Sequence, residues 1–273
     1  MQNGIHFISG LPRAGSTLLA ALLRQNPRFS AGMRSPLCTL VDAMLLATSQ
    51  RSETAVFIDD DQRERLLRGL FEAYYAEIHP QQVVFDTDRA WTTKLEAIAT
   101  LFPQARVICC VRNPAWVMDS LERLIRRNAL HPSGIFNFDP AGNVYSRVEG
   151  LGSAGGLVGF PFRGLREAAY GPHGDRLLLV RYETMVANPL GTLAAIYGFI
   201  GEELFGHDPG HIEPSYDMVE FDMRMGTPGL HHVGPRVHAP PRPTILPPDL
   251  FTRYERDAFW EDPAQLPPTV RLL

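Results

Sequence analysis

The segment 5–23 places a short strand-like run, a turn with two glycines and a helix-forming run in direct succession. Gly10 and Gly15 lie in the turn, and the run 18–23 contains only leucine and alanine. The first N–H groups of a helix have no partner within the helix, and its macrodipole adds partial positive charge. An anion can therefore be held there mainly by backbone groups. The segment predicts a phosphate-binding loop and indicates a nucleotide ligand.

The side chains of this loop differ from those of a nucleoside-triphosphatase P-loop. The spacing of Gly10 and Gly15 fits that motif, but Ser16 stands where its lysine would reach the outer phosphates, and a cation comes earlier, at Arg13. One cation with the hydroxyls of Ser16 and Thr17 suits a single 5′-phosphate that carries a transferable tetrahedral group better than a metal-bridged triphosphate. An ordinary glycine turn between a strand and a helix is the alternative.

A second strand-to-helix junction follows the buried-strand pattern of 105–111. Arg112 ends the strand, Asn113 and Pro114 suit a helix cap and first turn, and Ser120 lies two helical turns further on. An arginine offers the planar fork that a phosphate monoester prefers. Taken alone, the pair is more simply explained as a strand end and a surface hydroxyl. Its weight comes from its combination with the first loop.

These two junctions resemble those of the PAPS-dependent sulfotransferases, in particular the branch with tyrosylprotein sulfotransferases and many bacterial enzymes. PAPS is 3′-phosphoadenosine 5′-phosphosulfate, and the phosphosulfate loop of this branch reads P-R-S/A-G-S/T-T. The run 177–189 also resembles the family's V-x-Y-E-x-L-V-x-x-P strand end, and 226–232 resembles the C-terminal loop that closes over the cofactor. The resemblance implies that PAPS is bound by Arg13, Ala14, Gly15, Ser16, Thr17, Leu18, Arg112, Ser120, Tyr182, Thr227, Gly229 and Leu230.

For three of these residues the resemblance implies a definite partner. Arg112 and Ser120 fall at the spacing of the arginine and serine that bind the 3′-phosphate in the family. Tyr182 matches a tyrosine near the adenine, although a half-buried strand-end tyrosine whose hydroxyl binds water explains it equally well.

The resemblance further implies transfer of a sulfuryl group from PAPS to a hydroxyl or amine of a small-molecule or peptidyl acceptor, with 3′,5′-ADP as product. Such a transfer needs cations or N–H groups on the leaving side and a base on the acceptor side. Arg13 can serve the leaving side. Many relatives add a lysine near the second strand, which this chain lacks. We expect Arg89 to substitute for it, with Lys94 as the alternative.

The general base is not given by the resemblance, because Met33 lies near the place of the glutamate that tyrosylprotein sulfotransferases use. Asp86 and His231 are the candidates, since a strand end or a covering loop could direct either one toward the sulfur. Each also has a simpler structural explanation, Asp86 as a turn cap and His231 as a ring packed in a loop. The catalytic candidates are thus Arg13, Asp86, Arg89 and His231.

Alternating strand and helix signals predict an α/β fold. Strand runs at 5–9, 83–85, 106–111 and 177–181 are separated by helix-like stretches, which favours a three-layer sandwich with a central, mostly parallel sheet. The 273 residues suit one sulfotransferase-like domain over 1–273. We expect its proline- and histidine-rich segment 203–248 to be an irregular covering segment.

Composition narrows the partners and the location. A net charge of −4 gives no general basic field for nucleic acid, and no apolar stretch is long enough for a membrane span. Three cysteines without a disulfide or metal-ligand pattern favour a reducing cytoplasm. We expect no metal, and the oligomeric state stays open. Two other functions remain: a P-loop nucleotide kinase, which Ser16 disfavours, and a non-catalytic nucleotide-binding module, which the unidentified base leaves open.

Overall fold

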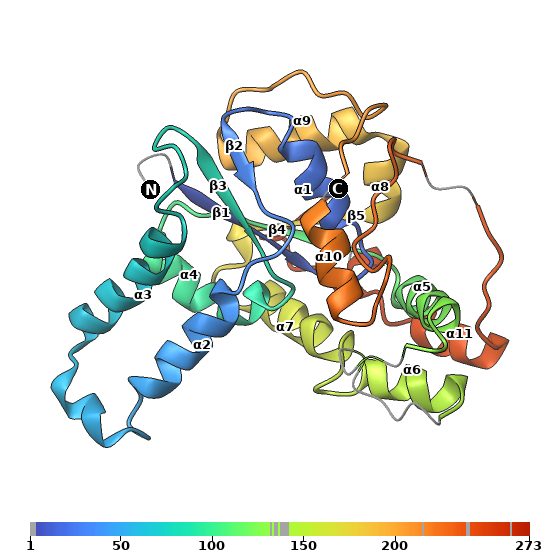
Figure 1. Cartoon of the computed structure of the whole chain (residues 1–273), viewed down its shortest axis with the longest axis horizontal. Coiled ribbons are helices and arrows are strands. Elements are labelled where there is room, and N and C mark those ends of the chain that lie inside the picture. Colours follow the sequence, from blue (N-terminus) through green and yellow to red (C-terminus); the bar gives the residue numbers. More distant parts are fainter. Residues whose placement is uncertain are drawn as a thin grey trace.

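The computed structural model describes residues 4–131, 133, 136, 142–214, 216–238, 241–262 and 264–273. Within these residues six strands form one sheet in the order β2-β3-β1-β4-β5-β6, and every neighbouring pair is parallel (Figure 1). The strands are β1 (Ile5–Gly10), β2 (Phe29–Ala31), β3 (Val83–Thr87), β4 (Val107–Val111), β5 (Leu177–Arg181) and β6 (Arg271–Leu272). The predicted α/β fold with a parallel central sheet is confirmed.

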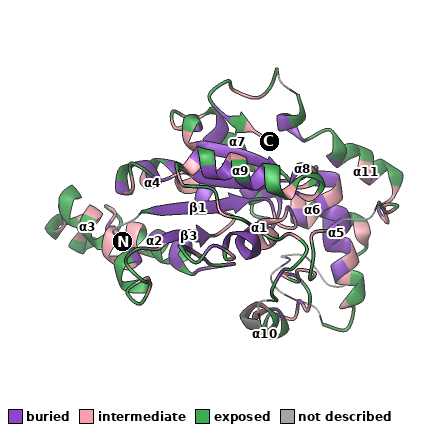
Figure 2. Ribbon diagram, turned by 90° about the horizontal axis from the view of Figure 1, so that it is seen from above, coloured by how far each residue is buried: buried purple, intermediate pink, exposed green. Residues whose placement is uncertain are grey.

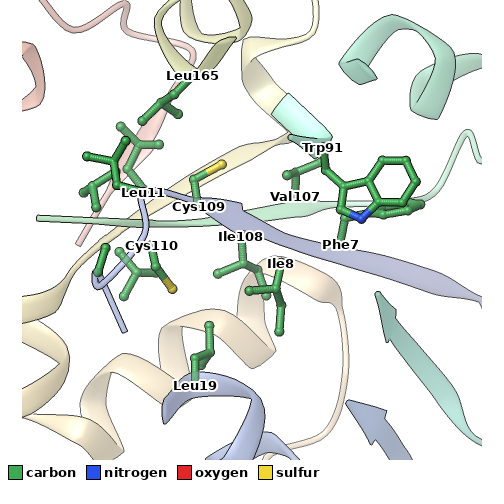
Figure 3. Close-up of a cluster of buried hydrophobic side chains, with 14 of the residues drawn as sticks. Phe7, Ile8, Leu11, Leu19, Trp91, Val107, Ile108, Cys109, Cys110 and Leu165 are labelled. Carbon is green, nitrogen blue, oxygen red and sulfur yellow. The ribbon is translucent and has the colours of Figure 1, made fainter. Parts of the chain in front are cut away.

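Helices cover both faces of this sheet. Figure 3 shows Leu165 of α7 on one side of β4 and Leu19 of α1 on the other, with Cys109 facing the first and Cys110 the second. The helices are α1 (Ser16–Leu23), α2 (Leu37–Ala47), α3 (Asp60–Tyr74), α4 (Leu95–Leu101), α5 (Pro114–Arg127), α6 (Val144–Gly152), α7 (Gly159–Tyr170), α8 (Tyr182–Ala187), α9 (Pro189–Ile200), α10 (Tyr216–Arg224) and α11 (Pro248–Glu255).

The central strands are apolar because both of their faces are covered. Every residue of β1, β3 and β4 is buried, and β5 exposes only Arg181. Such strands form continuous hydrophobic runs rather than alternating ones. Figure 2 shows the buried residues gathered in the sheet and in the helix faces against it. All three cysteines are buried and free.

The segment 203–248 is not irregular throughout, because it contains the nine-residue helix α10. The expectation was wrong at this point: the many prolines of the segment lie outside 216–224, where an amphipathic helix can form. Elsewhere in the segment the described residues have no helix or strand until α11 begins at Pro248. That the whole chain is one domain stays a prediction.

The segment that follows α10 is fixed to α5 by one buried carboxylate, that of Asp119. This side chain accepts hydrogen bonds from Thr244 Oγ1 at 3.0 Å and from the backbone N–H of Ile245 at 2.7 Å. It also pairs with Arg123 and Arg242, each at 2.9 Å. Burial alone would raise the pKa of Asp119, but these donors and charges hold it below its ordinary value. The carboxylate therefore stays ionised and holds the segment against α5.

Candidate functional site

The turn between β1 and α1 has the backbone of a close-fitting loop. Gly10 has φ 116°, and a side chain there would overlap the carbonyl oxygen of Cys110 on the neighbouring strand. Gly15 has φ 98° and directly precedes α1. A Cβ atom at Gly15 would lie 3.0 Å from the ring of Tyr182. At both positions the positive φ and the lack of space for a side chain favour glycine, and α1 begins directly after the second one.

A cavity of about 250 Å³ lies over this loop, and we call it the loop cavity. It is strongly basic although the chain has a net charge of −4. Among the described residues its lining includes the single carboxylate of Asp88, against five arginines: Arg13, Arg34, Arg89, Arg112 and Arg236. Such a concentration of cations at a helix start suits an anionic ligand.

Most of the loop residues predicted to bind a cofactor line this cavity. They are Arg13, Gly15, Ser16, Thr17 and Leu18. Ala14 does not, because its side chain is packed into the core beneath the loop.

Arg13 links the loop to two other parts of the chain. Its Nε donates to Ser120 Oγ on α5 at 3.1 Å, and its Nη1 donates to the backbone carbonyl of Leu230. Burial, and then the charge of Arg112, lower the pKa of Arg13. The sequence placed Arg13 and Ser120 at opposite ends of a nucleotide, so their direct contact is a finding of the structure.

A second cavity, of about 560 Å³, adjoins the first and is called here the Arg112 cavity. The two share Arg112, Tyr182, Val237 and His238. The guanidinium carbon of Arg112 lies 4.3 Å from the centre of the Tyr182 ring, and its Nε lies 3.4 Å from Glu183. That Nε is buried and has no hydrogen-bond partner. Because buried donors are nearly always paired, this atom points to a ligand acceptor.

The covering segment contributes a histidine paired with a carboxylate. His231 lines the loop cavity, and its Nδ1 lies 2.6 Å from Asp222 Oδ1. The backbone N–H of His231 donates to the other carboxylate oxygen at 2.7 Å. A carboxylate at Nδ1 fixes the proton there and leaves Nε2 as an acceptor. Sequence reasoning missed Asp222, because only the helix α10 brings it back to a residue nine positions later.

The other predicted residues of the covering segment differ in position. Leu230 lines the loop cavity, whereas Gly229 lines a smaller cavity beside it. Thr227 is fully buried and lines neither. The side chain of Thr227 is therefore packed in the protein rather than presented to a cofactor.

Asp86 is not placed as a base. Its carboxylate is fully buried and accepts hydrogen bonds from Ser35 Oγ at 2.8 Å, Tyr75 OH at 2.7 Å and Trp91 Nε1 at 2.7 Å. Burial raises the pKa of Asp86, and these hydrogen bonds act in the opposite direction. The side chain does not line the loop cavity, unlike that of Asp88. Asp86 instead joins β3 to three surrounding segments, so its role as a base stays a prediction that this geometry does not favour.

Arg89 and Lys94 differ in position. Arg89 lines the loop cavity, and burial, followed by the charge of Arg34, lowers its pKa. Lys94 pairs with Asp42 of α2 at 2.7 Å. Arg89 is thus part of the cavity wall, whereas Lys94 does not line the loop cavity.

The described residues hold neither a metal-binding cluster nor a membrane-spanning helix. They contain no group of three histidine, cysteine or acidic side chains arranged to hold a metal ion. Within the same part of the chain, no helix combines the length and apolar character of a membrane span.

Comparison with known proteins gives a family and a fold. The family model described as Sulfotransferase family matches residues 6–206. The sulfotransferase domain from the curacin biosynthetic pathway has a TM-score of 0.50 and 19% identity, over 74% of this chain and 75% of that chain. The sulfotransferase domain of the Synechococcus PCC 7002 olefin synthase has a TM-score of 0.46 and 20% sequence identity, and the match covers 74% of each chain. A sulfotransferase from Alicyclobacillus acidocaldarius has a TM-score of 0.46 and 16% sequence identity, and the match covers 81% of this chain and 89% of that chain.

Proposed function

Because the chain belongs to the sulfotransferase family, we propose that it moves a sulfuryl group from PAPS to a hydroxyl or amine of a small-molecule or peptidyl acceptor. The observation that carries the proposal is the groove formed by the loop cavity and the Arg112 cavity, which share Arg112 and Tyr182. Arg13 and Arg89 lie along its first part, and Arg112 and Arg242 along its second. A nucleotide with a 5′-phosphosulfate and a 3′-phosphate carries anionic groups that match both sets.

The residues of the groove fit this donor. The buried Nε of Arg112 has an ion-pair contact with Glu183 but no hydrogen-bond partner, and a 3′-phosphate would give it an acceptor. Ser120, which lines neither cavity but accepts a hydrogen bond from Arg13, is assigned to the same phosphate, and Tyr182 is assigned to the adenine. The 5′-phosphosulfate is assigned to the loop and the start of α1, through the backbone and hydroxyls of Ser16 and Thr17.

Each proposed catalytic residue has a defined task. Bound PAPS supplies the sulfuryl group: a bond forms between the acceptor atom and sulfur, and the bond from sulfur to the 5′-phosphate oxygen breaks with its electron pair on that oxygen. Arg13 and Arg89 stabilise the negative charge that grows there. Nε2 of His231 takes the acceptor proton, and Asp222 orients the ring and stabilises the imidazolium that results. The backbone carbonyl of Leu230 accepts a hydrogen bond from Arg13, and Gly229 forms the turn that positions His231.

Ligand binding separates this function from the two alternatives. Thermal unfolding is measured with 3′,5′-ADP, with Mg-ATP and with AMP, since a ligand of the folded state raises the unfolding temperature. We expect the largest rise with 3′,5′-ADP. A rise with Mg-ATP alone supports a nucleotide kinase. Binding of 3′,5′-ADP without transfer from labelled PAPS to any acceptor of a broad panel supports the non-catalytic module.

The base is tested by two substitutions. His231→Ala is expected to lower kcat by roughly 10²- to 10⁴-fold while the Kd for 3′,5′-ADP stays unchanged. Asp222→Asn is expected to lower kcat less, because the ring loses the carboxylate that orients it but keeps Nε2 as the proton acceptor. His211→Ala, at an exposed position outside the groove, is the control. An unchanged kcat in His231→Ala contradicts the assignment.

The location stays a prediction. The cytoplasm is expected for a chain whose cysteines form no disulfide.

A further inference from the structure

A third cavity lies on the other side of His231 and is called here the side cavity. It shares Met33, His231, His232 and Val233 with the loop cavity. Since the same four residues line both, the two cavities adjoin, and His231 forms part of their common wall. A molecule in the side cavity therefore lies against His231, next to the cavity assigned to the phosphosulfate.

The lining of the side cavity is mainly apolar. Val219 and Met223 lie one turn apart on α10, and their side chains stand on the same helix face. They are 55% and 63% exposed, which leaves apolar surface for a ligand to cover. Met33 and Val233 extend this surface on the other wall.

Charged partners are scarce in this lining. Among the described residues it contains no arginine or lysine. Its one carboxylate, Asp222, already accepts two hydrogen bonds from His231. A carboxylate or a phosphate placed there would lose its hydration without gaining a cation, which is costly. The cavity thus disfavours an anionic acceptor group, in contrast to the five arginines of the loop cavity.

The size of the side cavity sets the size of its occupant. Its volume is about 150 Å³. An apolar cavity of about 150 Å³ in another protein binds benzene, so one six-membered ring or a branched alkyl group of similar volume is the expected limit.

We propose that the acceptor is an uncharged phenol or alcohol whose apolar body, about one ring in size, enters the side cavity and places its hydroxyl at Nε2 of His231. This rests on the proposed sulfuryl transfer. The hydroxyl proton passes to His231, the acceptor oxygen bonds to sulfur, and the electron pair of the broken bond leaves on the 5′-phosphate oxygen. His231 returns its proton to water. The apolar face of α10 thus selects the acceptor, while the loop cavity holds the donor.

Three matched phenols test the size and the charge of the acceptor. Transfer from labelled PAPS is measured with phenol, 4-hydroxybenzoate and 2-naphthol. We expect kcat/KM for phenol to exceed that of the other two by about tenfold or more, because a carboxylate and a second ring are excluded. Equal or better transfer to 4-hydroxybenzoate or 2-naphthol overturns the proposal, as does transfer to other acceptors but to none of these phenols.

Two substitutions test the location. Val219→Trp and Met223→Trp fill the side cavity without touching the loop cavity, and each is expected to raise KM for phenol about tenfold. Glu220→Trp, on the next position of α10 and outside both cavities, is the matched control with unchanged KM. The Kd for 3′,5′-ADP is measured in all three. An unchanged KM for phenol in both filling variants overturns the proposal. If the wild-type protein does not bind 3′,5′-ADP, the proposed function is overturned instead.

Discussion

His6 couples the stability of the sheet to pH. It lies within β1 and is only 7% exposed, and its Nδ1 accepts a hydrogen bond from the backbone N–H of Arg106 at 3.1 Å. This bond fixes the start of β4 beside β1. Burial, and then the charge of Arg106, lower the pKa of His6 from 6.5 to about 4. The folded protein therefore holds this ring neutral at neutral pH.

The size of the effect follows from linkage between protonation and folding. In the unfolded chain the ring has an ordinary pKa of about 6.5, so the unfolded state binds the proton first as the pH falls. The contribution of the neutral ring is fully present above about pH 6.5 and is lost progressively down to about pH 4. Since one pKa unit is worth about 1.36 kcal/mol, the full loss is about 3.4 kcal/mol, of which about 2 kcal/mol is lost at pH 5.

Urea unfolding at pH 7.5 and pH 5 measures this loss. His6→Asn keeps a side-chain acceptor for the Arg106 N–H but does not titrate. The carboxylates contribute equally to both proteins, so the comparison isolates the ring. We expect the wild-type free energy of unfolding to fall by about 2 kcal/mol more than that of His6→Asn between the two pH values. An equal fall in the two proteins refutes the reasoning.

Three further substitutions test the loop, the buried carboxylate of β3 and the attachment of the covering segment. Gly10→Ala is expected to lower the free energy of unfolding by about 3 kcal/mol or more, because the new side chain overlaps the neighbouring strand and the backbone there is strained. Gly201 also has a positive φ but is surrounded by open space, so Gly201→Ala is expected to lower the free energy of unfolding by only about 1 kcal/mol. Equal losses for the two variants in urea unfolding contradict this. Asp86→Ala leaves two buried donors and one part-buried donor without an acceptor and is expected to cost about 3 kcal/mol or more. The kcat of the folded fraction is expected to stay within about threefold of wild type, and a loss of kcat to the level of His231→Ala would support Asp86 as a base. Asp119→Asn is expected to speed amide exchange at 244–246 by about tenfold or more, and unchanged exchange there would show that this carboxylate does not fix the segment.

Local patterns made the fold and the glycine turn between β1 and α1 predictable. The strand, the two glycines and the leucine-rich run at the N-terminus are adjacent in sequence, and each favours one backbone conformation. The junction at Arg112 is equally local, and the side chain of Asn113 caps α5 as expected. A reading of neighbouring residues was therefore sufficient for both.

Side-chain direction was not predictable in the same way. Every residue of β3 is buried, so its sequence lacks the alternation that shows which face Asp86 occupies. The pairing of His231 with Asp222 depends on α10, a helix within a segment whose prolines favoured irregular structure. The turning of Lys94 to Asp42 likewise depends on the packing of α2, which the sequence near Lys94 does not contain.

Recognition of a 3′-phosphate by the cation of Arg112 is central to the proposed function. Calorimetric titration of 3′,5′-ADP and of AMP, which lacks that phosphate, measures the preference directly in the wild-type protein, in Arg112→Ala and in Arg24→Ala, an exposed arginine outside the groove. We predict that the wild-type protein and Arg24→Ala bind 3′,5′-ADP at least about tenfold more tightly than AMP, and that Arg112→Ala loses most of this preference while its affinity for AMP changes little. Equal affinities in the wild-type protein, or an equal loss for both ligands in Arg112→Ala, would contradict the account.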